Sequence, residues 1–137
     1  MKFLLRMTTA TLVLGACMYS PMVSADALLR CDVTYAGSTQ VLETLAVNDP
    51  YTVPSVDIGG RFWFKAVMVG HAARVDYIKL YAYLDTRTQP LLIQEAIFLP
   101  PFKTTSPSTP LTGTQRLYAG PVGRELIYSC TLQGEQP

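Results

Sequence analysis

The stretch LLRCDVTY, residues 28–35, alternates between apolar and polar side chains along its length. Such a period of two is typical of a strand that buries one face, and Cys31 falls on the apolar side. The stretch RELIYSCTL, residues 124–132, alternates in the same way and places Cys130 on its apolar side. Together the two stretches predict terminal strands that each carry one cysteine into the core.

Cys31 and Cys130 are therefore candidates for a disulfide that joins the first strand to the last. Two cysteines are usually bonded to each other in an exported chain, and the N-terminal stretch described below predicts export. Closing a loop of roughly 100 residues stabilises a protein by up to about 4 to 5 kcal/mol in the chain-entropy model. The alternative is a pair of metal-binding thiolates, which the single histidine of the chain makes the weaker interpretation.

The chain between these stretches is rich in β-branched and aromatic residues bounded by glycine and proline, which favours strands. Three stretches predict an antiparallel meander: RFWFKAVMVG (61–70), VDYIKLYAYLD (75–85) and PLLIQEAIFL (90–99). TQRLYAG (114–120) is expected to pair with the last strand across a Gly-Pro-Val-Gly turn. STQVLETLAV (38–47) fits either a helical face or a strand, and we favour the strand.

Two stretches read as irregular, NDPYTVPSVDIGG (48–60) and PPFKTTSPSTPLTG (100–113), and the second is expected to be a surface loop. About seven strands in roughly 110 residues, without a convincing helix, predict an all-β fold. We expect a small antiparallel β-sandwich of immunoglobulin-like size, with a small β-barrel as the alternative. The wide separation of the two cysteines does not match a true immunoglobulin domain.

The first 25 residues resemble a secretory signal peptide, with Lys2 and Arg6 before a short apolar run. Val23-Ser24-Ala25 is an expected cleavage site, which leaves residues 26–137 as a single β-domain. Leu14-Gly15-Ala16-Cys17 also resembles a lipobox, in which Cys17 would carry lipid. We therefore expect a periplasmic or secreted protein, with an outer-membrane lipoprotein as the alternative.

The charge and hydropathy of the sequence limit the classes of partner that we expect. The formal net charge is +1, and no basic run is present, so a nucleic-acid partner is not expected. No apolar run approaches the roughly 20 residues of a spanning helix, so a membrane contact is expected only through lipid on Cys17.

The sequence carries no pattern typical of catalysis. The one histidine, His71, falls in a predicted turn, and neither a nucleophile elbow nor a phosphate-binding loop occurs. Asp49 and Asp57 share a loop, yet their spacing is too sparse to indicate a calcium site. We expect no cofactor, no metal and no enzymatic activity.

The stretch 75–85 provides the candidate binding residues. If its alternate apolar residues face the core, the opposite face presents Tyr77, Lys79, Tyr81 and Tyr83. Trp63 is expected on the same outer face of the preceding strand. Tyrosine and tryptophan are enriched where proteins meet partners. The alternative is structural, because tyrosines on neighbouring strands also stabilise a sheet by packing on one another.

These patterns favour an exported, non-catalytic binding or assembly protein of the bacterial envelope. It would engage a protein or a glycan through this aromatic sheet face. One alternative is a hydrolase of cell-wall or other glycans that uses a pair of acidic residues. Another is a structural subunit that completes a neighbour's sheet through an open edge strand.

Overall fold

The computed structural model describes residues 20–21, 25–102 and 108–134. Within them lie nine strands and two single-turn 3-10 helices, η1 and η2. Their bounds are β1 Leu28–Tyr35, β2 Ser38–Leu45, η1 Pro50–Thr52, β3 Val56–Ile58, β4 Phe62–His71, β5 Arg74–Leu84, β6 Leu91–Phe98, β7 Ser108–Pro110, β8 Gln115–Ala119, η2 Gly120–Val122 and β9 Arg124–Gln133. Strands β3 and β7 are only three residues long, and the other seven are the longer strands that the sequence predicts.

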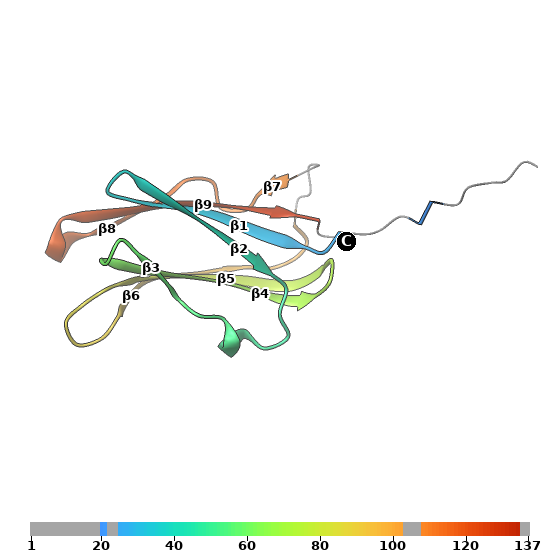
Figure 1. Ribbon diagram of the computed structural model, residues 1–137, viewed down its shortest axis with the longest axis horizontal. Helices are drawn as coiled ribbons and strands as arrows, with labels where there is room; N and C mark the ends of the chain where they lie inside the picture. The colour runs from blue at the N-terminus through green and yellow to red at the C-terminus, as the bar shows by residue number, and fades with distance from the viewer. Residues whose placement is uncertain (1–19, 22–24, 103–107, 135–137) are drawn as a thin grey trace, which may run out of the picture.

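The strands form two antiparallel sheets that pack as two layers (Figure 1). The first sheet has the order β2-β1-β9-β7, and β8 also pairs with β9. The second sheet has the order β3-β4-β5-β6. The predicted small β-sandwich is confirmed, and its two sheets do not close into the barrel that was the alternative.

The core lies between the layers and is filled by alternate residues of the longer strands. Leu29, Cys31 and Val33 of β1 are each 0% exposed. On the opposite sheet, Ile78 and Leu80 of β5 are at most 1% exposed. The alternation seen in the sequence is therefore the alternation between core and surface.

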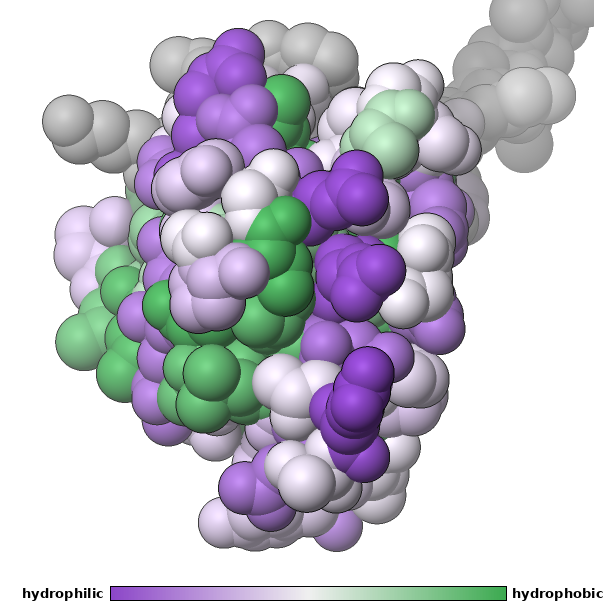
Figure 2. Space-filling model, turned by 90° about the vertical axis from the view of Figure 1, so that its left-hand side faces the viewer, coloured by the Kyte–Doolittle hydropathy of each residue, from purple (hydrophilic) through white to green (hydrophobic). Residues whose placement is uncertain are grey.

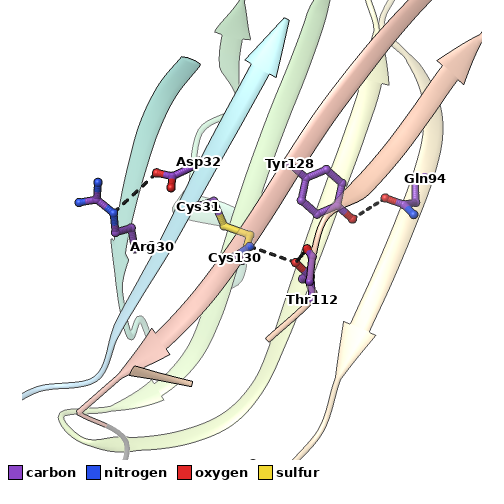
Figure 3. Close-up of a disulfide and its surroundings, with 8 residues drawn as sticks. Arg30, Cys31, Asp32, Gln94, Thr112, Tyr128 and Cys130 are labelled. Carbon is purple, nitrogen blue, oxygen red and sulfur yellow. Dashed lines mark hydrogen bonds and ion pairs between the residues drawn. A yellow bond between two sulfur atoms is a disulfide. The ribbon is translucent and has the colours of Figure 1, made fainter. Parts of the chain in front are cut away.

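The disulfide between Cys31 and Cys130 is confirmed, and it lies within one sheet (Figure 3). The two residues are directly opposite on β1 and β9, with their Cα atoms 4.1 Å apart. An immunoglobulin disulfide instead joins the two sheets, so this bridge differs in kind as well as in spacing. The bridge links the first and last strands as expected.

The stretch 38–47, which fitted either a helix or a strand, contains strand β2, and all eight residues of β2 pair with β1. The prediction that residues 100–113 form only a loop is wrong for Ser108–Pro110, which is strand β7. Pro110 is tolerated because β7 lies at the sheet edge, where a missing N–H removes no ladder hydrogen bond. Residues 48–60 are also less irregular than expected, since they contain η1 and β3.

The predicted meander of β4, β5 and β6 is confirmed by their pairing. Gly70 explains how the first hairpin of the meander closes. The register between β4 and β5 shifts at Val69 and Gly70, just before the turn. A Cβ atom on Gly70 would lie 2.1 Å from the carbonyl oxygen of Arg74, so a side chain does not fit. His71 follows as an exposed residue at the turn.

Candidate binding surface

The outer face of the second sheet carries aromatic residues on neighbouring strands. Trp63 of β4 and Tyr83 of β5 are directly opposite each other, and Lys65 is opposite Tyr81. Trp63 and Lys65 point outward because Phe62 and Phe64, which alternate with them on β4, are buried in the core. Tyr81 and Tyr83 point outward because Ala82 and Leu84, which alternate with them on β5, are also buried. The register of β4 on β5 therefore brings these four residues together.

These four residues, Trp63, Lys65, Tyr81 and Tyr83, form what we call the aromatic face. The rings of Tyr81 and Tyr83 are stacked, with centroids 6.3 Å apart and planes at 18°. The ammonium of Lys65 lies 5.9 Å from the centroid of the Tyr81 ring, at the distance of a cation–π contact. The residues thus support one another and remain partly exposed.

Lys79 and Tyr77 lie on the same outer side but join the cluster less closely. Lys79 forms an ion pair with Glu95 of β6 at 3.4 Å. Tyr81 and then Glu95, close to its ammonium, raise the pKa of Lys79 above its ordinary value. Tyr77 is opposite Val69, near the far end of the strand. The five residues that the sequence singled out share one face, and Trp63, Tyr81 and Tyr83 form its centre.

A pocket of about 420 Å³ opens beside the aromatic face and is lined by Ser55, Trp63, Tyr83 and Pro90. Ser55 precedes β3, while Pro90 lies in the loop between β5 and β6. Sequence reasoning missed these two residues, because each belongs to a segment whose path across the sheet has no periodic pattern. Burial, followed by the neighbouring Tyr81 and Glu95, raises the pKa of Tyr83, so its hydroxyl is neutral at physiological pH.

The indole N–H of Trp63 is an unusual polar group of the aromatic face. Its nitrogen is shielded from solvent and donates to no acceptor among the described residues. Leaving a buried donor unpaired costs about 1 to 3 kcal/mol, so such groups are rare and call for an explanation. Because the nitrogen is shielded, a molecule in the pocket would contact other atoms of the Trp63 side chain and would reach the N–H only if neighbouring side chains moved.

Acidic residues occupy local structural roles. Asp49 accepts a hydrogen bond from the Tyr51 amide at 2.9 Å, and Asp57 accepts one from the Gly60 amide at 2.6 Å. Over the part of the chain that the structure describes, no group of three His, Cys, Asp or Glu residues could hold a metal ion.

A carboxylate pair for hydrolysis is not assembled at either of two main hollows. The aromatic pocket is lined by no acidic residue, and the groove beside β2 has one, Glu43. Elsewhere Asp76 pairs with Arg74 and Glu125 pairs with Arg116.

Exposed apolar side chains gather on strand β6, at the other edge of the second sheet. Leu91, Leu92 and Ile97 are 52%, 45% and 53% exposed. Figure 2 shows the end of the sandwich next to the β5–β6 turn, where apolar surface collects on one side. Ile93 of β6 has no partner in the pairing with β5, so a β-bulge interrupts the regular backbone pattern of this edge strand.

Comparison with protein-family models, with curated proteins and with solved structures finds no match to this chain. Among residues 20–21, 25–102 and 108–134, no helix is long and apolar enough to cross a membrane. Cys17, the candidate lipidation site, lies outside the described residues, as does nearly all of the expected signal peptide.

Proposed function

We propose that this chain is an exported, non-catalytic binding or assembly protein of the bacterial envelope that engages a protein or glycan through its aromatic face. The observation that carries the proposal is the pocket on the outer face of the second sheet, which is lined by Trp63, Tyr83, Ser55 and Pro90. The internal disulfide is compatible with an oxidising compartment outside the cytoplasm.

The chemistry of the pocket suits recognition by stacking. Trp63, Tyr83 and Pro90 present flat apolar surfaces, while Ser55 and the tyrosine hydroxyl provide hydrogen-bonding groups. A sugar ring or a flat side chain of a protein partner can lie against such surfaces. Tyrosine and tryptophan anchors at the centre of an interface often contribute about 2 kcal/mol or more each.

The test compares the wild-type protein with the double variant Tyr81→Ser, Tyr83→Ser. Both are incubated with purified peptidoglycan and, separately, with an extract of envelope proteins. We expect the double variant to bind at least about tenfold more weakly to whichever material retains the wild type. Retention on peptidoglycan assigns a glycan, and specific capture of a protein assigns a protein partner.

The matched control is Tyr118→Ser, which removes a tyrosine that is 72% exposed on the other sheet. It should bind as the wild type does. Unfolding temperatures of all variants separate binding from folding, because loss of the fold in the double variant would show that the tyrosines act structurally. Equal binding by a folded double variant, or wild-type binding to neither material, would contradict the proposal.

A further inference from the structure

A groove of about 620 Å³ runs along β2, at the opposite edge of the sandwich from β6. Its walls are residues 40–45 on one sheet and Val47, Thr52–Pro54, Val56 and Ala66 on the other side. The volume is within the range of roughly 300 to 1,000 Å³ that is typical of binding sites. This groove is separate from the aromatic pocket and is not part of the function proposed above.

The core is incomplete at this edge. Leu29, Cys31 and Val33 of β1 are fully buried, but Leu42 of β2 points inward and remains partly exposed. Strand β3, which lies on the opposite sheet, has only three residues, so the chain before it covers β2 irregularly. Apolar side chains supplied from outside could enter between the two sheets here.

Among the described residues, the backbone of β2 also has no partner strand on its outer side. The N–H of Cys130 donates to Thr112 Oγ1 at 3.0 Å, and the C=O of Cys130 accepts from the Leu111 N–H at 2.9 Å. Both backbone groups of Cys130 therefore point away from β1. Cys31 and Cys130 are therefore a non-hydrogen-bonded pair, so Cys31 directs its backbone groups toward Leu42 of β2.

Since backbone direction alternates along a strand, Val41 and Glu43 point their N–H and C=O groups away from β1. Strand β2 is the last strand of its sheet, and no backbone hydrogen bond of Val41 or Glu43 to other described segments is present. An apolar groove thus lies beside a row of unpaired backbone donors and acceptors, which is the arrangement that an added strand completes.

We propose that β2 and its groove form a strand-addition site for an extended segment of a partner protein whose inward-facing side chains are apolar. Glu43 is the only ionisable residue of the lining, and it already pairs with Arg30 at 3.1 Å. A charged segment therefore finds no counter-charge in the groove. A second copy of β2 fits poorly, because three of its four inward-facing residues, Ser38, Gln40 and Thr44, are polar.

The test uses the full chain with a strand added at its end. Leu45, Leu28 and Gln133 lie side by side across the sheet, so the C-terminal end of β9 lies near the end of β2. A Gly-Ser linker of about ten residues after Pro137 can span the three strand spacings of about 4.8 Å each. The added segment, Thr-Val-Thr-Val-Thr-Val-Thr, would then run antiparallel to β2.

We expect the added segment to raise the unfolding temperature and to slow hydrogen exchange at the Val41 and Glu43 amides at least tenfold. A matched fusion in which aspartate replaces the three valines should change neither. Unchanged exchange and unfolding temperature in the valine fusion would overturn the proposal, as would equal effects of the two fusions.

The variant Val41→Pro removes one edge N–H, which makes no bond to β1, and a side chain that is 49% exposed. In this variant the valine fusion should no longer protect the Glu43 amide. Protection that persists would overturn strand addition. If the unfused protein instead dimerises with concentration, and Val41→Pro abolishes the dimer, the occupant is a second copy and the partner assignment is overturned.

Discussion

At the scale of single residues, Tyr128 holds the two sheets together. It belongs to β9, is 1% exposed, and donates a hydrogen bond from its hydroxyl to Gln94 Oε1 of β6 at 2.6 Å (Figure 3). Its ring also packs against Phe64, with centroids 5.0 Å apart. A buried hydroxyl needs such a partner, so Tyr128 and Gln94 fix how β9 lies over β6.

Burial raises the pKa of Tyr128, which makes the stability of the fold depend on pH in the alkaline range. The phenol ionises near pH 10 in the unfolded chain but only at higher pH in the folded protein. Below about pH 10, Tyr128 is protonated in both states and does not make the unfolding free energy depend on pH. Above about pH 10, the phenol ionises first in the unfolded chain, so the unfolding free energy falls as the pH rises. Urea unfolding at pH 8 to 11 measures this loss.

The variant Tyr128→Phe should lose about 1 kcal/mol at neutral pH, because Gln94 loses its donor, and should show a shallower decline above pH 10. Tyr83→Phe is the control, since the pKa of Tyr83 is also raised but its side chain is partly exposed. An equally steep decline in Tyr128→Phe would contradict this account.

At the scale of elements, the longer strands could be predicted because burial on one face imposes a period of two on the sequence. Strands β1, β5 and β9 show this clearly, and their core residues are those expected. Strand β7 was missed because three residues are too few to show a period. Its hydrogen bonds to β9 depend on residues that are distant in sequence.

The candidate surface could be predicted in part for the same reason. Alternation along β5 placed Tyr81 and Tyr83 outward, but only the register with β4 brings Trp63 opposite Tyr83. The pocket wall at Pro90 comes from a loop, whose path no local pattern specifies. That β2 is an edge strand could not be predicted, because the alternation of side chains does not indicate the order of the strands in a sheet.

The disulfide links strands β1 and β9 and should raise the unfolding free energy measurably. Cys31 and Cys130 are 99 residues apart in sequence, so reducing their bond frees nearly the whole domain in the unfolded state. We expect the unfolding free energy to fall by up to about 4 to 5 kcal/mol. Urea unfolding with and without reductant measures the change, and the double variant Cys31→Ala, Cys130→Ala should resemble the reduced protein. An unchanged midpoint after complete reduction would contradict this expectation.

At the scale of the whole molecule, one segment separates the two hollows. Thr52, Val53, Pro54 and Val56 line the groove beside β2, whereas Ser55 lines the aromatic pocket with Trp63. Neighbouring residues of an extended chain point to opposite sides, so Ser55 lines the pocket while Pro54 and Val56, on either side of it, line the groove. A strand that packs against Pro54 and Val56 therefore also fixes Ser55.

Occupation of the groove should consequently change the surroundings of Trp63, the single tryptophan of the chain. We expect the fusion with the valine segment to alter the intensity or the wavelength of tryptophan emission, and the fusion with the aspartate segment to leave the emission unchanged. The change should disappear in Val41→Pro. If the valine segment protects the Val41 amide while the emission stays the same, the two sites are independent. If occupation of the groove also changes the affinity of the aromatic pocket for a ligand, that ligand must change the affinity of the groove by the same factor.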